Sequence, residues 1–338
     1  MAARVGWTRK GSKRSFRYYD ARGRQLTDAQ KLERIDSLVI PPAWKDVWIS
    51  PSARAKLQAT GVDAAGRKQY LYHPAFRARQ EQAKFDRLIG FAERLPDLRE
   101  TMAEHMELEG YPADKVAAIA VRLINLGWFR VGGDRYAKQS RTFGITTLRK
   151  SHVTVRGSRI SFRYRGKHSI MVRNAVVDAE LAAAIRDLRA VSGARLFQYE
   201  LPDGTYCNLS QRKLNDYVKT HLGENYTAKD FRTWGGTLLA AIELAQHKPP
   251  ENPADAKKRI AAVMRHVAER LGNTPAVARS SYVSPAVVEQ YLDGRTIEDF
   301  RPRHLRVVGA RDLGLDVEEQ ATLSLLRSWR IRASRAAA

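Results

Sequence analysis

Residues 153–172 read VTVRGSRISFRYRGKHSIMV, and their pattern differs from that of the sequence on either side. Apolar and polar residues alternate in three short runs, separated by the glycine turns Arg156-Gly157-Ser158 and Arg165-Gly166-Lys167. A period of two residues is typical of strands with one buried face, and short glycine turns connect antiparallel strands. The segment therefore predicts a three-stranded antiparallel meander. Its buried face should carry Val153, Val155, Ile160, Phe162, Tyr164, Ile170 and Val172.

Helical patterns surround this meander. Residues 113–126 are good helix formers that end at Gly127. Thr227-Ala-Lys-Asp230 resembles a capping box, which predicts that a helix begins there. Apolar residues repeat at helical spacing over 260–271, and Gly272-Asn-Thr-Pro275 then offers a C-cap, an N-cap and a first-turn proline. The larger part of the chain is therefore expected to be mainly helical, with an asparagine in a break between two helices.

The first quarter of the chain has a different composition. Residues 1–85 are rich in proline, glycine and aromatic residues, and they form short alternating runs. A helix-compatible run begins at Pro74 and continues to Leu95, where Pro96 is expected to end it. We therefore predict an α+β protein, with a small and mainly β domain over 1–85 and a larger, mainly helical domain over 86–338.

The charge balance points to a polyanionic partner. The chain has 59 lysines and arginines against 36 aspartates and glutamates, which gives a net charge of +23. Residues 1–85 contain 18 of the basic and 7 of the acidic residues, so +11 of the surplus lies in this quarter of the chain. A surplus of this size is typical of proteins that bind nucleic acid.

The rest of the composition excludes several classes of protein. Apolar residues make up 43% of the chain, which argues against a disordered or fibrous protein. The single cysteine, Cys207, excludes a disulfide framework and a cysteine-based zinc site. No run approaches the 18 or so apolar residues that a membrane span needs, and the N-terminus lacks an apolar signal segment. We therefore expect a cytoplasmic protein without membrane partners.

Common motifs for nucleotide and metal binding are absent from the sequence. There is no Gly-x-x-x-x-Gly-Lys phosphate loop, no His-Glu-x-x-His and no EF-hand, and the eight histidines lack metal-ligand spacing. We therefore expect no metal and no cofactor. A protein of this charge can still act on phosphodiesters if cationic side chains stabilise the phosphate and a side-chain hydroxyl is the nucleophile.

Five residues fit that requirement, and each alone has an ordinary structural explanation. Arg130 follows a helix end, where arginines are usually solvated or cap the helix. Lys167 lies at a hairpin tip, where most lysines have no special role. Arg232 lies one turn into a capped helix, where a cation opposes the helix dipole but can help to bind a phosphate. Asn273 alone would be a helix-break residue, and Tyr282 is one of 13 tyrosines.

Taken in order, the five residues resemble the catalytic set of type IB DNA topoisomerases of the poxvirus and bacterial kind. The set is an arginine, a β-turn lysine, a helical Lys229-x-x-Arg232, and Gly-Asn-Thr-Pro whose asparagine precedes Tyr282 by nine residues. Many members have histidine where this chain has Asn273, which can donate a hydrogen bond but adds no charge. Further segments carry the resemblance: Ile40-Pro-Pro-Ala-Trp44 with Val47-Trp48-Ile49, Gly66-Arg-Lys-Gln-Tyr-Leu-Tyr72, Phe129-Arg-Val-Gly132 and Asp230-Phe-Arg-Thr-Trp-Gly235.

This resemblance implies that the protein relaxes supercoiled DNA without ATP. Tyr282 would attack the scissile phosphate and form a 3′-phosphotyrosyl enzyme, and religation would need no external energy because one phosphodiester replaces another. Arg130, Arg232 and Asn273 would stabilise the phosphate, and Lys167 would protonate the 5′-oxygen leaving group.

The resemblance also implies how DNA is bound. A monomer, associated with the nucleoid, would close as a C-shaped clamp on double-stranded DNA, with 1–85 as the DNA-binding domain and 86–338 as the catalytic domain. The expected DNA contacts are Gln69, Tyr70 and Tyr72 in the major groove, and Arg67, Lys68 and Tyr136 at phosphates.

Two alternatives remain open. A tyrosine recombinase or integrase uses a related set of residues, but it usually has His-x-x-Arg where this chain has Lys229-x-x-Arg232, and it lacks the Pro-Pro-Ala-Trp segment. A non-catalytic architectural DNA-binding protein would explain the charge but not the ordered set.

Overall fold

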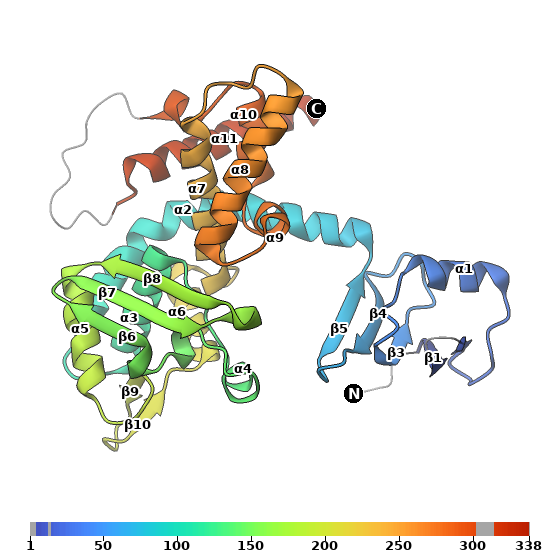
Figure 1. Ribbon diagram of the computed structural model, residues 1–338, viewed down its shortest axis with the longest axis horizontal. Helices are drawn as coiled ribbons and strands as arrows, with labels where there is room; N and C mark the ends of the chain where they lie inside the picture. The colour runs from blue at the N-terminus through green and yellow to red at the C-terminus, as the bar shows by residue number, and fades with distance from the viewer. Residues whose placement is uncertain (1–4, 13–14, 302–313, 338) are drawn as a thin grey trace. The chain divides into compact units, whose positions relative to one another are not determined.

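The chain divides into two units, Met1–Lys84 and Phe85–Ala338, in the computed structural model, which describes residues 5–12, 15–301 and 314–337 (Figure 1). The first unit is mainly β, and the second is mainly helical with a three-stranded antiparallel sheet. The α+β class predicted from the sequence is therefore confirmed.

A five-stranded antiparallel sheet with the strand order β2-β1-β3-β4-β5 forms the first unit, together with helix α1 (Ala29–Ser37). Its core is small, and it consists of Trp7, Ile35, Val47, Ile49 and Ala59. The strands are β1 (Trp7–Ser12), β2 (Ser15–Tyr19), β3 (Lys45–Ile49), β4 (Leu57–Val62) and β5 (Lys68–Tyr72).

The Pro-Pro-Ala-Trp segment has a structural role in this unit. The Arg9 guanidinium donates hydrogen bonds to the carbonyls of Ile40, Pro41 and Trp44, at 3.3, 3.0 and 2.7 Å. The Trp44 ring lies on Gly61 of β4, where an added Cβ would come within 2.6 Å of the ring. The segment is therefore a loop that one arginine holds against the sheet.

Helix α2 (Pro74–Met106) begins in the first unit and continues into the second. The prediction that Pro96 ends this helix is wrong, because the helix runs ten residues further. A proline inside a helix costs about 3 kcal/mol. Beyond it, Leu98 and Met102 are buried, and each buried side chain of this size contributes about 1.5–3 kcal/mol. Tertiary packing of the apolar face thus outweighs the local cost.

The meander in the second unit is confirmed. Strands β6 (Val153–Arg156), β7 (Arg159–Arg165) and β8 (Met171–Val177) pair antiparallel in that order. Helices α3 (Ala113–Gly127) and α5 (Ala179–Ala190) pack against the sheet. One expected member of the buried face is wrong: Ile170 is half exposed and precedes β8, because the turn predicted at Arg165-Gly166-Lys167 is longer and includes a 3-10 helix over Lys167–Ser169.

The other elements of the second unit build one hydrophobic core around α3 and α7. Within the described ranges, no helix is both long enough and apolar enough to cross a membrane. The helices are α4 (Asp134–Gln139), α6 (Gln211–Leu222), α7 (Ala228–Ala245), α8 (Pro253–Leu271), α9 (Pro275–Ser281), α10 (Pro285–Leu292) and α11 (Val317–Ala337). A small hairpin of β9 (Gln198–Glu200) and β10 (Tyr206–Asn208) and the short 3-10 helices η1 (Ile145–Thr147), η2 (Lys150–His152), η3 (Lys167–Ser169) and η4 (Ile297–Phe300) complete the unit.

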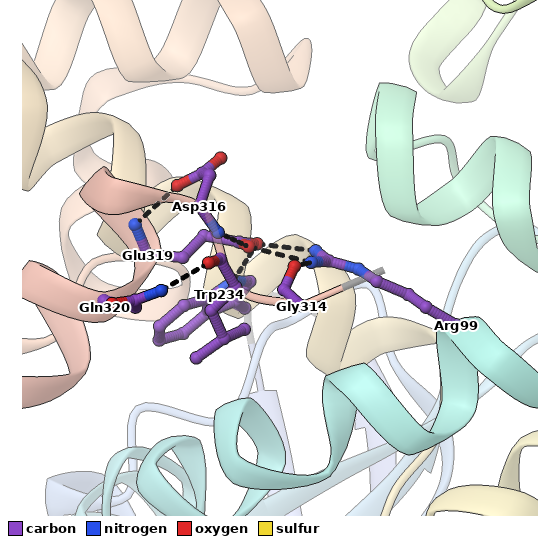
Figure 2. Close-up of polar contacts among 7 residues, drawn as sticks. Arg99, Trp234, Gly314, Asp316, Glu319 and Gln320 are labelled. Atoms are coloured by element: carbon purple, nitrogen blue, oxygen red, sulfur yellow. Dashed lines mark hydrogen bonds and ion pairs between the residues drawn. The ribbon is translucent and has the colours of Figure 1, made fainter. Parts of the chain in front are cut away.

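A buried carboxylate joins three of these helices (Figure 2). Glu319 of α11 accepts two hydrogen bonds from the Arg99 guanidinium of α2, at 2.9 and 2.7 Å, and one from the Trp234 indole of α7 at 3.3 Å. Glu319 also forms a reciprocal capping pair with Asp316, whose side chain accepts from the Glu319 amide at 2.7 Å. This junction anchors α11 to the rest of the unit.

Candidate active site

Arg232 is a buried cation without an acidic partner among the residues that the structure describes. The capping box between Thr227 and Asp230 fixes the start of α7, with the Thr227 amide 2.8 Å from the Asp230 carboxylate, and this places Arg232 in the first turns of the helix. Its side chain is only 5% exposed and donates hydrogen bonds to the carbonyls of Trp128 and Leu271. Burial lowers the pKa of Arg232, and Arg130 adds to this effect, but a guanidinium stays charged at any working pH.

Arg130 reaches the same place from the loop after α3. Trp128 caps α3 in the left-handed region, with φ 51°, and its ring packs on Gly235 of α7. A Cβ at Gly235 would lie 2.2 Å from the Trp128 ring nitrogen, so only glycine permits this approach. The Arg130 guanidinium donates to the Gly272 carbonyl at 2.7 Å and to the Asn273 Oδ1 at 2.6 Å. The end of α8 is thereby tied to the loop after α3.

Asn273 lies in the break between α8 and α9, as predicted. Gly272 ends α8 in the left-handed region with φ 61°, and the Thr274 side chain caps α9 by accepting from the Val277 amide. The Oδ1 of Asn273 accepts a hydrogen bond from Arg130, but its Nδ2 is buried and has no hydrogen-bond partner in the described part of the chain. Asn273 therefore presents an unused N–H donor beside two arginines.

Tyr282 lies at the C-terminal end of the short helix α9, also as predicted. The Thr237 hydroxyl of α7 donates to the Tyr282 carbonyl at 3.2 Å, and Gly236 lies so close that a Cβ there would be 2.8 Å from the same carbonyl. The Arg232 guanidinium lies 5.1 Å from the centre of the Tyr282 ring. Burial acts to raise the pKa of Tyr282, but Arg232, Lys229 and Arg130 outweigh it and hold this pKa below its ordinary value.

Lys167 is apart from these four residues. It is exposed in the turn between β7 and β8, where His168 and Ser169 both have left-handed backbone angles, at φ 60° and 59°. Within the described part of the chain, no hydrogen bond or ion pair joins Lys167 to Arg130, Arg232, Asn273 or Tyr282. The structure thus brings four of the five predicted residues into one cluster and leaves the fifth on an exposed hairpin.

Sequence reasoning missed three residues that shape the cluster. Tyr164 of β7 is buried beside the two arginines, and burial raises its pKa to about 12 although both arginines act to lower it. Trp128 and Thr237 position Arg232 and Tyr282 through their backbone and hydroxyl contacts. The alternation in β7 predicted the burial of Tyr164, but nothing in the sequence indicated what lies next to it.

The predicted DNA contacts on β5 divide between the two faces of the strand. Lys68, Tyr70 and Tyr72 are exposed on one face, and the two tyrosine rings stack with centroids 6.2 Å apart. Gln69 is half-buried on the other face, where its amide donates to the Asp63 carboxylate at 2.8 Å. Arg67 precedes β5 and pairs with the same carboxylate at 2.7 Å.

Tyr136, the remaining predicted contact, is on α4 in the second unit and is half exposed. Its helix follows Gly132 and Gly133 in the same loop that carries Arg130.

Among the described residues, no group of three or more histidine, cysteine, aspartate or glutamate side chains could hold a metal ion. Arg232, Lys229 and Arg130 surround the Tyr282 phenol with positive charge, an arrangement that suits attack on a phosphodiester.

Comparisons with known proteins indicate the family of this chain. The family model for the catalytic core of eukaryotic DNA topoisomerase I matches residues 73–300, and that for the N-terminal domain of bacterial DNA topoisomerase IB matches residues 15–63. DNA topoisomerase 1B of Acanthamoeba polyphaga mimivirus is 32% identical over 293 residues, which cover 85% of this chain and 87% of that protein. DNA topoisomerase 1B of vaccinia virus (strain Copenhagen) is 22% identical over 263 residues, 76% of this chain and 78% of the viral protein.

Proposed function

The chain belongs to the type IB DNA topoisomerases of the small bacterial and viral type, and from this we propose that it relaxes supercoiled DNA through a covalent 3′-phosphotyrosyl intermediate at Tyr282. The observation that carries the proposal is the buried Arg232 guanidinium, which lies against the Tyr282 ring and has no acidic partner within 5–12, 15–301 and 314–337. A cation that the protein leaves unneutralised beside a nucleophile is suited to a phosphate.

In the proposed reaction, the Tyr282 hydroxyl loses its proton to water, and its oxygen attacks the scissile phosphorus. The new bond joins phosphorus to the tyrosine oxygen, and the bond between phosphorus and the 5′-oxygen breaks. The lowered pKa of Tyr282 favours the phenolate that attacks. Religation is the reverse reaction, and the downstream duplex would swivel between the two steps without ATP.

Arg130, Arg232 and Asn273 stabilise the transition state in this proposal. Both arginines would donate to nonbridging oxygens, which carry charge in the transition state. The unpartnered Nδ2 of Asn273 would add a neutral donor. Arg130 would have to exchange its bond to Asn273 Oδ1 for a phosphate oxygen, or share it.

DNA binding in the proposal uses both units. The exposed face of β5, with Tyr70 and Tyr72, would read the major groove, and Lys68 would contact phosphates beside it. The clamp expected from the sequence stays part of the proposal, as does action by a monomer. Gln69 would have to release Asp63 before it could contact a base.

Relaxation of a negatively supercoiled plasmid, without ATP and with EDTA present, tests the function. We expect relaxation by the wild type and none by Tyr282→Phe, which should still bind the plasmid because only the hydroxyl is removed. Tyr291→Phe is the control, since Tyr291 is buried and donates to the Lys248 carbonyl. An adduct on a denaturing gel that persists in Tyr282→Phe would place the nucleophile elsewhere. Strand exchange between matched sequences would indicate a recombinase, and plasmid retardation alone an architectural protein.

Lys167 is proposed as the general acid, because its hairpin is exposed and the 5′-alkoxide is a poor leaving group. We expect Lys167→Ala to slow single-turnover cleavage by about 10²- to 10⁴-fold, the range for loss of a general acid. A substrate with sulfur at the 5′ bridging position should restore the rate, because a thiolate leaves without a proton. Arg232→Ala should remain slow on both substrates. If sulfur does not rescue Lys167→Ala, the lysine is a DNA contact and not the acid.

A further inference from the structure

Tyr164 is buried in the active-site cluster, but the proposed reaction does not use it. It lies on β7 opposite Val172 of β8 and is 4% exposed. Within the described ranges, no residue forms a hydrogen bond with the Tyr164 hydroxyl, and the bonds of Arg130 and Arg232 end on other groups. A polar group that is shielded from water and has no partner costs free energy, so it requires an explanation.

The other buried tyrosines do not share this feature. Each of the other three in the described part of the chain has a hydrogen-bond partner for its hydroxyl at 2.9–3.2 Å: Tyr217 bonds His105, Tyr226 accepts from Arg94, and Tyr291 donates to the Lys248 carbonyl. The unpaired hydroxyl is therefore particular to the tyrosine that lies in the cluster.

Backbone contacts hold the end of β7 against the loop that carries Arg130. The Phe143 amide donates to the Arg165 carbonyl at 2.8 Å. Two residues later, the Ile145 amide donates to the Arg130 carbonyl, also at 2.8 Å. One short segment thus holds both the strand end and the loop.

Tyr164 lies on the face of β7 that packs against this loop. Side chains alternate between the two faces of a strand, so Tyr164 shares its face with Phe162. The Phe162 ring packs against the Phe129 ring with centroids 4.7 Å apart, and Phe129 directly precedes Arg130. The Tyr164 ring therefore lies beside the loop of Arg130, close enough that both active-site arginines act on its pKa.

The polar side chains next to Tyr164 are donors. Arg130 and Arg232 cannot accept a hydrogen bond, because a guanidinium has only donors. His152 is close by, with ring centroids 6.1 Å apart, and its Nδ1 accepts from the Arg149 amide at 3.2 Å. Burial lowers the pKa of His152, so its neutral ring carries the proton on Nε2 and donates there. The Tyr164 hydroxyl is therefore a donor that gains an acceptor when an anion binds.

The two tyrosines of the cluster differ in protonation. Burial raises the pKa of Tyr164 to about 12, although Arg130 and Arg232 act to lower it. The pKa of Tyr282 is instead held below its ordinary value by its cationic neighbours. Opposite shifts at neighbouring groups are typical of a division of roles in an active site. Tyr282 is suited to lose its proton and attack, whereas Tyr164 keeps its proton at neutral pH and is suited to donate a hydrogen bond.

From these contacts we propose that Tyr164 is a further catalytic residue, whose hydroxyl donates a hydrogen bond to a nonbridging oxygen of the scissile phosphate. This inference rests on the proposed function. A phosphate bound by Arg130 and Arg232 brings negative oxygens beside the Tyr164 hydroxyl, which then has its acceptor. A neutral donor held in place by β7 needs no rearrangement as charge develops on these oxygens, and such preorganised donors lower an activation barrier.

The first test is Tyr164→Phe, which removes the hydroxyl and keeps the ring. Single-turnover cleavage of a short duplex with one cleavage site should slow by about 10- to 100-fold, as for loss of one hydrogen bond to a charged group. The thermal midpoint should not fall, because the hydroxyl has no partner among the described residues of the free protein. Tyr217→Phe is the matched control, since its buried hydroxyl lies 2.9 Å from His105. Its midpoint should fall, and its cleavage rate should match the wild type.

The contact with phosphate is tested with two modified duplexes, each with sulfur in place of one of the two nonbridging oxygens at the cleavage site. Sulfur is a weak hydrogen-bond acceptor. Where it replaces the oxygen that Tyr164 contacts, the hydroxyl no longer helps the wild type, and Tyr164→Phe should cleave within about twofold of it. On the other modified duplex, the full difference between the two proteins should remain. An equal effect of Tyr164→Phe on all three duplexes would overturn the contact.

The outcomes separate this inference from the proposed function. If the wild type cleaves and Tyr282→Phe does not, but Tyr164→Phe cleaves at the wild-type rate, the inference is wrong and the proposed function stands. A thermal midpoint of Tyr164→Phe below that of the wild type would show that the hydroxyl stabilises the fold, and would also overturn the inference. If the wild type forms no adduct with the duplex, or Tyr282→Phe still forms one, the proposed function is wrong and the role of Tyr164 falls with it.

Discussion

Arg99 and Arg232 both lie mostly shielded from solvent in the second unit, with the Arg99 side chain 16% exposed and Arg232 5% exposed, but the protein treats their charges in opposite ways. The Arg99 guanidinium donates one hydrogen bond to each oxygen of the Glu319 carboxylate, whose negative charge neutralises it (Figure 2). Arg232 faces two backbone carbonyls and the Tyr282 ring, and none of the described residues accepts a hydrogen bond from its Nε. A neutralised cation stabilises the fold, whereas an unneutralised one keeps its charge for a ligand at some cost to stability.

The largest effect is expected where the neutralised pair is broken. Glu319→Ala should lower the free energy of unfolding by about 3–5 kcal/mol, because it removes a buried carboxylate and leaves the mostly buried Arg99 guanidinium without its acidic partner. Glu318→Ala is the matched control from the same helical turn. Glu318 is partly exposed and pairs with Arg301 at 3.3 Å, so its loss should cost about 0–1 kcal/mol. Urea denaturation gives both values, and similar losses for the two variants would remove the distinction between the two arginines.

Arg232→Ala should reverse this pattern. We expect single-turnover cleavage to slow by about 10²- to 10³-fold, or roughly 2.7–4 kcal/mol of transition-state stabilisation, as for loss of one charge-stabilising donor. Its unfolding free energy should fall by less than that of Arg99→Ala, because an unpaired buried charge is removed rather than created. Arg99→Ala should keep most of its cleavage rate at temperatures where it is folded. If Arg232→Ala is less stable but cleaves at the wild-type rate, the Arg232 charge stabilises the folded protein and not the transition state.

The smallest expected effect concerns the pH dependence of cleavage. Positive charges near Tyr282 favour its phenolate and lower its pKa, so removing one of them must raise it. Lys229 is exposed, and its contribution should be about 0.2–1 kcal/mol, or roughly 0.15–0.7 pH units. Lys229→Ala should therefore move the inflection of the cleavage rate at subsaturating DNA to higher pH, which reports the free enzyme. Lys258→Ala on α8 is the control. Equal inflections for the wild type, Lys229→Ala and Lys258→Ala would show that Lys229 does not lower the pKa of Tyr282.

Local sequence signals predicted most of the framework of the active site. The alternation of 153–172 predicted the meander, the capping box at Thr227 predicted the start of α7, and Gly272 to Pro275 predicted the break between α8 and α9. Each of these signals depends on contacts within one or two turns of the chain. Pro96 is the counterexample, because its local signal to end a helix was overruled by packing that only the folded unit provides.

The sequence by itself determined which residues are available for chemistry and which helices and strands carry them. The capping motifs and the order of five residues along the chain can be read directly from it: Arg130, Lys167, Arg232, Asn273 and Tyr282. Only the tertiary structure decided the partners of those residues. Among the described residues, Arg232 has no carboxylate beside it, whereas Arg99 pairs with one that is 220 residues away in the sequence. The number of charged residues follows from the composition. Whether one charge neutralises another depends on the distance between the two groups, and for residues far apart in the sequence only the fold sets that distance.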